Sequence, residues 1–201
     1  FIKENINSKN KKQINVLNIG AGGEIEEYLK SIPNIKLLSM DINSKTKPDI
    51  IADISDKKIL KKIKIKPDYI TCFEVLEHVK EPFKAIQNLF KLSTKKTVLL
   101  FSVPFIFPIH EEPNDFYRYT KYGLRYIFKD FSKVEITNRD GFIDNMFVLS
   151  VRLKFSKNYL LKLYAAISIF LYFTLFPLIK FIQFFIKFEN ITTGYLIRIK
   201  K

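Results

Sequence analysis

Cysteine is nearly absent from this 201-residue sequence, in which Cys72 is the only one. A single cysteine cannot form a disulfide within the chain, which agrees with a reducing compartment such as the cytoplasm. The first thirteen residues, FIKENINSKNKKQ, lack an apolar core, so we expect no signal peptide there. Histidine is also scarce. His78 and His110 are the only two, which leaves few candidates for a general base near neutral pH.

Acidic residues are in short supply as well, because 20 Asp and Glu face 34 Lys and Arg and leave a formal net charge of +14. A basic chain can bind nucleic acid or an anionic membrane surface. The lysines are scattered over many segments, without a basic cluster or an aromatic platform on which bases could stack. We therefore expect no nucleic-acid partner, whereas the charge favours contact with anionic lipid.

No linker or internal repeat divides the chain, and 47% hydrophobic residues are enough for one domain over residues 1–201. Short apolar runs bounded by turn residues predict seven strands, at 14–20, 35–41, 49–54, 67–75, 97–105, 132–142 and 194–201. Helical spacing predicts four helices between them, at 24–32, 57–65, 82–93 and 120–131. This alternation implies an α/β fold with a mostly parallel sheet, whose ligands bind at the carboxyl ends of the strands.

A glycine-rich turn, NIGAGGE, follows the first predicted strand. Glycines there let a backbone approach a ligand closely, and the next helix presents free N–H groups. Asp41 ends the second strand, where a carboxylate can accept both hydroxyls of a ribose or, alternatively, cap a helix. The turn continues as GAGGEI, which has Ile25 in place of the last glycine of a dinucleotide fingerprint. We therefore expect the ligand to be a nucleoside and not a dinucleotide.

Five segments resemble, in order, those of class I S-adenosylmethionine-dependent methyltransferases, and most of all the type 11 methyltransferase-domain group. The segments are VLNIGAGG, LLSMDI, IIADISD, PDYITCFEVLEHVKEP and VLLFSVPF. The resemblance covers roughly residues 14–142 and also the last strand. The resemblance implies a Rossmann-like three-layer sandwich with strand order 3-2-1-4-5-7-6, in which strand 7 is antiparallel. It also implies methyl transfer with S-adenosylmethionine as cofactor.

By position, the resemblance implies a cofactor site at the ends of the first four strands. The methionine part would lie beside Gly20, Ala21, Gly22, Cys72 and Phe73. The ribose hydroxyls would bind Asp41, and the adenine would lie against Ile42, Asp53 and Ile54. Two residues depart from the family pattern: Asn18 replaces an acid, and Glu24 replaces a third glycine. Asn18 can still hydrogen-bond to the amino group of the cofactor, but it lacks the charge to pair with it.

The segment SVPFIFPIHEEPNDFYRYT follows the fifth strand, on the side where an acceptor would enter. It is similar to a Pro-x-His…Asp-Phe-x-Arg-Tyr-Thr pattern of the same group. We expect His110 to act as general base or acceptor contact, Asp115 to orient it or a hydroxyl, and Arg118 to bind an anionic group of the acceptor. The alternative is a structural lid, in which Arg118 pairs with Asp115 and the tyrosines pack beneath it.

The second histidine lies in EVLEHV, after the fourth strand. His78 could line the acceptor side, or Glu74, Glu77 and His78 could hold a metal ion. We favour a turn that packs and caps this segment, because the consecutive Glu77 and His78 do not share one helical face. No metal ion is therefore expected.

The run LYAAISIFLYFTLFPLIKFIQFF, at 163–185, carries no charge between Leu163 and Ile179. As a helix that stretch is about 25 Å long, whereas a hydrocarbon core is about 30 Å thick, and Pro177 would kink it. Since the last strand must return beside the sixth, we expect a hydrophobic helical insertion at 145–190 rather than a single crossing. Its amphipathic end, KFIQFFIKF, and the residues Tyr159, Tyr164 and Tyr172 suit a membrane interface. The alternatives are a homodimer interface or a cap on the domain itself.

Together these features predict a methyltransferase at the inner face of the membrane that O-methylates a sugar or a lipid-linked glycan. The resemblance adds to this, since similar proteins with such insertions accompany cell-surface polysaccharide assembly. A quinone or small-lipid methyltransferase of the same fold is the first alternative. The second is an inactive cofactor-binding partner subunit, suggested by Asn18 and Glu24, and the third is an RNA methyltransferase, suggested by the charge.

Overall fold

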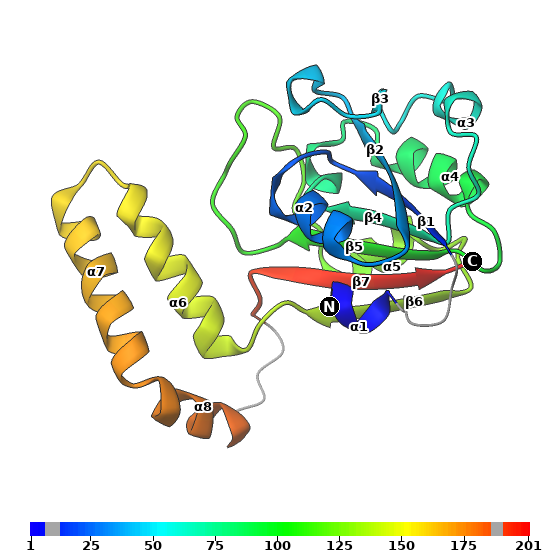
Figure 1. The fold of residues 1–201 in the computed structure, drawn as a ribbon. Coiled ribbons are helices and arrows are strands. Elements are labelled where there is room, and N and C mark those ends of the chain that lie inside the picture. The colour runs from blue at the N-terminus through cyan, green and yellow to red at the C-terminus, as the bar shows by residue number, and fades with distance from the viewer. Residues whose placement is uncertain (7–12, 186–190) are drawn as a thin grey trace.

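Seven strands form one sheet at the centre of the molecule, which we describe from a computed structural model over residues 1–6, 13–185 and 191–201 (Figure 1). The strands are β1 Ile14–Ile19, β2 Ile35–Asp41, β3 Ile50–Ile51, β4 Tyr69–Phe73, β5 Val98–Pro104, β6 Lys133–Asn138 and β7 Gly194–Lys200. Their order is β3-β2-β1-β4-β5-β7-β6, and β7 is antiparallel to both of its neighbours. The predicted α/β fold and strand order are therefore confirmed.

The inner strands are buried on both sides, as their near-continuous apolar sequences require. In β5, Leu99, Phe101 and Val103 pack in the larger hydrophobic cluster, whereas Leu100 packs in a second cluster on the opposite face. The larger cluster is covered by α3 Ile59–Lys62, α4 Pro82–Leu92 and α5 Lys121–Ile127. The second is covered by α1 Ile2–Asn5 and α2 Gly23–Ser31. Both faces of the sheet are thus layered with helices.

Four predicted elements end more than two residues earlier than expected. The sixth strand ends at Asn138 rather than residue 142, the helix expected over 120–131 ends at Ile127, and two further elements lose more than half of their length. The third strand was expected over 49–54 but pairs only at Ile50–Ile51, because the Asp53 carboxylate accepts hydrogen bonds from the N–H and hydroxyl of Ser55 and turns the chain. The helix expected over 57–65 spans only Ile59–Lys62, since Ile63 adopts extended backbone angles and is buried. Local periodicity predicts both elements, and tertiary contacts shorten them.

A helical arm, residues 142–185, lies between β6 and β7 and projects away from the sheet (Figure 1). It consists of α6 Phe142–Arg152, the 3-10 turn η3 Leu153–Phe155, α7 Tyr159–Thr174 and α8 Phe176–Phe185. It leaves the sheet where Pro104 of β5 pairs with Gly194 of β7, at the carboxyl end of β5. Residues 186–190, which complete the predicted insertion and include Lys187, lie outside the described residues.

Polar contacts hold the arm together. Asp144 of α6 accepts a hydrogen bond from the Tyr172 hydroxyl and one of 3.0 Å from Lys180 Nζ. Fully buried Asn145 hydrogen-bonds to the carbonyl of Ile191 and the N–H of Thr193, and so fastens α6 to the start of β7. Among the described helices, none is by itself long and apolar enough to cross a membrane; α7 and α8 are so only together, with a bend of 77° between them.

Candidate functional site

A cavity of about 640 Å³ opens at the carboxyl ends of β1, β2, β3 and β4. This is the edge of a parallel α/β sheet at which ligands bind. Eight residues predicted to contact a cofactor line it, namely Gly20, Ala21, Gly22, Asp41, Ile42, Asp53, Ile54 and Phe73. The volume lies within the range of about 300–1,000 Å³ that is typical of small-molecule sites.

The glycine turn forms one wall of this cavity. Gly20 has a φ of +88°, and a Cβ added there would lie 2.5 Å from Val75 Cγ2. Gly22, with a φ of +86°, donates its N–H to Glu26 Oε2 at 2.5 Å. The turn therefore needs glycine both for its backbone conformation and for its close approach to the segment after β4.

Asp41 holds the opposite wall in place. Its carboxylate accepts the N–H of Ala21 at 2.8 Å and the N–H of Asn43 at 2.7 Å. Each carboxylate oxygen has a second lone pair, so both can still accept a ribose hydroxyl. Asp41, Asp53 and Glu74 give the lining an acidic character that suits the cationic sulfonium of S-adenosylmethionine. The residues present thus fit this cofactor.

Two residues of the predicted cofactor set lie outside the lining. Asn18 is buried beneath the glycine turn, where its Nδ2 donates to the Gly20 carbonyl at 2.9 Å and its Oδ1 accepts from Thr71 Oγ1 at 2.8 Å. Cys72 is fully buried in the core, and burial raises the pKa of its thiol. Because successive side chains of a strand point to opposite faces, Phe73 meets the cavity and Cys72 does not. The Cys72 side chain therefore does not line the cavity, although Cys72 was predicted to lie beside the methionine part of the cofactor.

The segment after β5, residues 105–120, is fastened onto the 3-10 turn η2 Leu76–His78 that follows β4. The Phe116 N–H donates to the Glu77 carbonyl at 2.9 Å. The hydroxyl of Tyr119, which is buried, donates to the Leu76 carbonyl at 3.0 Å, and that of Tyr117 to the Lys80 carbonyl at 3.0 Å. The structure therefore brings together the two segments in which candidate acceptor residues were predicted.

Asp115 and Arg118 form a two-bonded ion pair in this segment, with N···O distances of 2.5 and 2.6 Å. These hydrogen bonds hold the pKa of Asp115 well below its usual range. Arg118 also donates to the carbonyls of Tyr117 and Pro108. Its guanidinium is therefore occupied, which favours the structural lid over the predicted contact with an anionic acceptor. Asp115 Oδ2 accepts the backbone N–H of His110 at 3.0 Å, which is compatible with its predicted orienting role.

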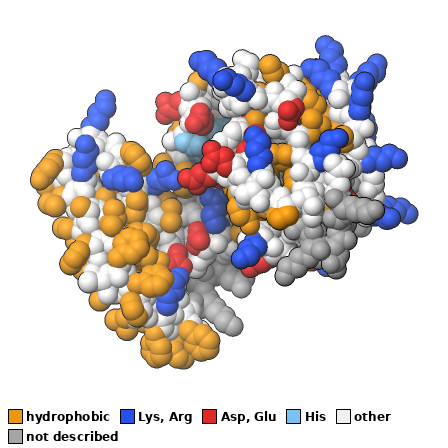
Figure 2. All heavy atoms as spheres, in the orientation of Figure 1, with side chains coloured by type: hydrophobic (Ala, Val, Ile, Leu, Met, Phe, Trp, Pro, Cys, Tyr) orange, Lys and Arg blue, Asp and Glu red, His pale blue; other side chains and the backbone are white. Residues whose placement is uncertain are grey.

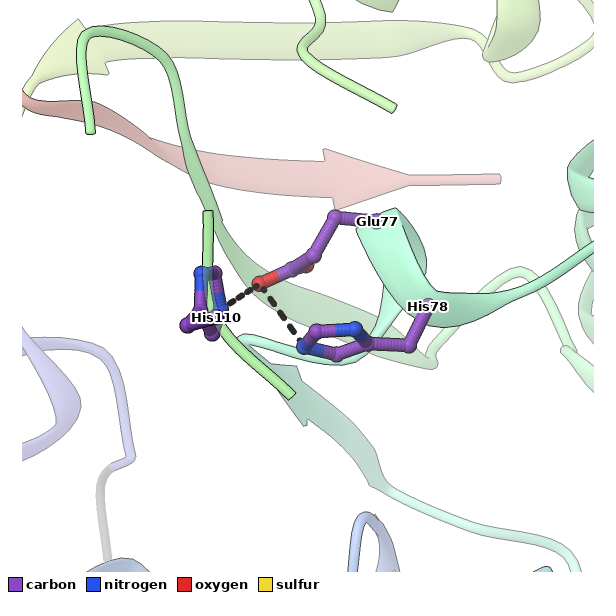
Figure 3. Close-up of side chains that lie close together, drawn as sticks. All are labelled: Glu77, His78 and His110. Atoms are coloured by element: carbon purple, nitrogen blue, oxygen red, sulfur yellow. Dashed lines mark ion pairs between the residues drawn. The ribbon is translucent and has the colours of Figure 1, made fainter. Parts of the chain in front are cut away.

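Glu77, His78 and His110 point toward one another, as Figure 3 shows, and His78 also lines the cavity. Glu77 Oε1 lies 3.7 Å from the Nε2 atom of each histidine, and the two imidazole rings contact each other edge to face. The Glu77 side chain is fully buried, and no described group hydrogen-bonds to either carboxylate oxygen. Burial, followed by the nearby Glu74 carboxylate, raises the pKa of Glu77 to about 8.

In the sequence Glu77 stands with Glu74 and His78 as a possible metal-binding group, whereas His110 is predicted separately as a general base or acceptor contact. In the structure Glu74 instead accepts hydrogen bonds from Ser102 Oγ, at 2.7 Å, and from Arg139. It also lies between the first cavity and a second one of about 590 Å³. The strand order could have indicated that His110 lies close to Glu77 and His78. Since β4 and β5 are neighbouring parallel strands, the segments that follow them meet at one edge of the sheet.

Comparisons with known proteins agree with this geometry. A family model described as a methyltransferase domain matches residues 2–134, more than half of the chain. No curated protein matches the sequence.

Solved structures share the fold. One is a SAM-dependent methyltransferase from Archaeoglobus fulgidus, with a TM-score of 0.59 and 18% identity over 94% of this chain and 86% of that one. Another is the plantazolicin methyltransferase BamL in complex with SAH, with a TM-score of 0.56 and 14% identity over 96% and 79%. A third is phosphoethanolamine N-methyltransferase 2 of Haemonchus contortus, with a TM-score of 0.55 and 12% identity over 96% and 50%.

Proposed function

The chain belongs to the methyltransferase-domain family and uses S-adenosylmethionine, and from that premise we propose that it methylates a hydroxyl of a sugar or lipid-linked glycan at a membrane surface. The observation that carries the membrane part is the apolar surface of the arm. The acceptor class rests on the contact between that arm and residues 105–120, which we call the acceptor segment.

Hydrophobic side chains cover the arm on the face shown in Figure 2. Seven large apolar side chains of α7 and α8 are more than 60% exposed, namely Tyr159, Leu160, Phe170, Phe173, Phe181, Phe184 and Phe185. Single exposed apolar side chains are normal on soluble proteins, whereas a concentration of them on one pair of helices marks a site of interaction. Lys162 and Lys180 accompany it, which is the pattern of a helix pair lying in a lipid interface. The net charge of +14 adds attraction to anionic lipid.

The arm also touches the acceptor segment. The guanidinium carbon of Arg152, at the end of α6, lies 4.6 Å from the centre of the Phe107 ring. That ring in turn contacts the His110 imidazole, with 5.5 Å between ring centres. An acceptor anchored in lipid beside the arm would therefore reach residues 105–120 without leaving the surface.

The cofactor supplies an activated methyl group, so the chain has to align the acceptor and remove its hydroxyl proton. The cavity aligns the cofactor through the glycine turn and Asp41. We assign the handling of the proton to the cluster of Glu77, His78 and His110, in which His110 is the predicted general base. Asp115 orients His110 through the backbone N–H.

Vesicle binding tests the membrane part. We expect the chain to float with vesicles of phosphatidylglycerol and phosphatidylcholine, and the variant Phe181→Glu/Phe184→Glu to lose this binding while it still binds SAH in calorimetry. Tyr122→Glu is the matched control, since this aromatic is 79% exposed but lies on α5 of the domain body. A wild-type chain that binds SAH but no vesicles, and that is dimeric in light scattering, would instead assign the apolar surface to a second copy.

Radiolabelled S-adenosylmethionine and a lipid extract test the acceptor. Label in the glycolipid fraction supports the proposal, and we expect the Phe181→Glu/Phe184→Glu variant to transfer less of it. Label confined to quinones or other small lipids would assign the alternative substrate class. Cofactor binding without transfer to any fraction would favour the inactive partner subunit.

A further inference from the structure

Three atoms that can ligate a metal ion converge at the edge of the cavity (Figure 3). Glu77 Oε1, His78 Nε2 and His110 Nε2 all lie within 4.8 Å of one another, and the oxygen is 3.7 Å from each nitrogen. Ligands bound to one divalent ion at about 2.0–2.2 Å stand roughly 3.0–3.5 Å apart. Small rotations of the side chains would therefore bring all three atoms to bonding distance.

The hydrogen bonds of the other ring nitrogens assign the tautomer of both histidines. His78 Nδ1 lies 2.8 Å from the Asn114 carbonyl oxygen. His110 Nδ1 lies 3.2 Å from the Pro108 carbonyl oxygen and 3.4 Å from Asp115 Oδ2. These oxygens only accept, so each Nδ1 carries the proton and each Nε2 presents a lone pair. Histidines that bind metals donate their second N–H to a carbonyl or carboxylate in the same way.

The third group is a carboxylate that lacks a partner within the part of the chain that the structure describes. The Glu77 side chain is fully buried, and neither of its oxygens accepts a hydrogen bond. Its backbone carbonyl, by contrast, accepts the N–H groups of Phe116 and Tyr117, so the segment around it is firmly held. A buried carboxylate without a donor or cation is unusual. A cation bound by Glu77 Oε1 and the two Nε2 atoms would give this carboxyl group the partner that it lacks among the described residues.

We propose that Glu77, His78 and His110 bind one divalent first-row transition-metal ion, such as Zn²⁺, through Glu77 Oε1 and the two Nε2 atoms. Two imidazoles and one carboxylate suit such ions better than Mg²⁺, which prefers oxygen ligands and water. Catalytic zinc sites use the same set of three protein ligands and leave a further position open. His78 lines the cavity, so an ion held by these residues would stand at the edge of the cofactor site.

The ion would stand where it can lower the pKa of an acceptor hydroxyl. The hydroxyl proton then leaves to solvent, the oxygen bonds to the methyl carbon, and the electron pair of the broken C–S bond stays on sulfur. In this form His110 acts as a ligand and not as the base. This role rests on the proposed function, whereas metal binding by the three residues does not.

The sequence makes the test selective, because any imidazole bound to metal must belong to His78 or His110. We would treat the full chain with EDTA, titrate it with Zn²⁺ by calorimetry, and record the absorption of its Co²⁺ form. We expect one ion per chain, and at least a tenfold loss of affinity in Glu77→Gln and in His110→Ala. Glu111→Gln is the matched control, since this acid lines the cavity outside the cluster and should leave the affinity within twofold of wild type.

Magnetic resonance of the two imidazoles covers the case in which a variant does not fold. In the metal-free wild type we expect both rings to be protonated on Nδ1, and Zn²⁺ to shift both Nε2 signals together. Absence of saturable Zn²⁺ binding to the wild type overturns the proposal, as does unchanged affinity in His110→Ala or a shift in only one ring. Vesicle binding and label transfer to the glycolipid fraction, measured on the same samples, separate this failure from a failure of the proposed function, because Zn²⁺ binding by the three residues needs neither lipid nor acceptor.

Discussion

Substitution of Gly20 by alanine would test how the glycine turn shapes the cofactor cavity. Two separate penalties meet at this residue. Its φ of +88° is strained for an L-residue, at a cost of ~1–2 kcal/mol. The new Cβ would also lie 2.5 Å from Val75 Cγ2, and such overpacking costs ~1–3 kcal/mol. We therefore expect Gly20→Ala to lower the free energy of unfolding by about 2–5 kcal/mol.

Gly23→Ala is the matched control in the same turn. Gly23 has a φ of +70°, but a Cβ added there would meet no described atom within 4 Å. Gly23→Ala should therefore lower the free energy of unfolding only by the conformational penalty, ~1–2 kcal/mol. Because Val75 lines the cavity as well, Gly20→Ala should also weaken SAH binding, and Gly23→Ala should do so less.

The steric part of the penalty can be removed at its source. Val75→Ala takes away the methyl group that the new Cβ would meet, so the double variant should be more stable than the sum of the two single changes predicts. We expect a coupling of ~1–3 kcal/mol in a double-mutant cycle from urea unfolding. Equal destabilisation by Gly20→Ala and Gly23→Ala, together with additive behaviour of the Val75 change, would refute this reasoning.

Three further predictions concern the cofactor wall and the arm. Asp41→Asn replaces one carboxylate oxygen with an NH₂ group, which cannot accept an N–H, so the hydrogen bond from Ala21 or that from Asn43 is lost and SAH affinity in calorimetry should fall at least about tenfold. Unchanged affinity would remove Asp41 from the site. Burial raises the pKa of Glu26, but the Gly22 N–H and Lys30 outweigh it and lower this pKa below 4.5. A carboxyl group with a depressed pKa stabilises the fold above that value and loses the effect as the pH falls, so Glu26→Gln should cost more stability in urea unfolding at pH 7 than at pH 3; an equal cost would contradict the ionic origin. Asp144→Ala removes the acceptor shared by Tyr172 and Lys180, so hydrogen exchange should speed up in α7 and stay unchanged in β5. Equal protection of α7 in the variant and the wild type would show that the arm does not depend on this contact.

Local patterns predicted the parts of the protein that local physics governs. Apolar runs of strand length placed the inner strands to within two residues at each end, because their side chains must be buried on both faces of the sheet. The glycines of GAGGEI marked a turn with positive φ, which other residues rarely adopt. The resemblance to a family added the strand order, which periodicity alone does not specify.

Side-chain placement was less predictable, since it depends on which face a strand presents and on what already contacts a group. Cys72 was expected on the cavity wall and lies in the core, one position before Phe73, which does line the cavity. For Arg118 the sequence left two roles open, a contact with an anionic acceptor or a pair with Asp115, and the structure shows the pair together with bonds to two backbone carbonyls. Neither outcome follows from residue type.

The sequence by itself determined that this chain forms a parallel α/β sheet with a nucleoside site at its carboxyl edge, and that residues 163–185 are too apolar for an ordinary surface. Only the tertiary structure decided that His110, 33 positions after Glu77, completes a cluster with Glu77 and His78, and that the apolar run folds as two helices bent by 77° and follows α6, whose Arg152 contacts Phe107. The reason is that burial preferences act on neighbouring residues along the chain. The convergence of lone pairs across two loops depends instead on how β4 and β5 pair and on the backbone hydrogen bonds that join the segments after them.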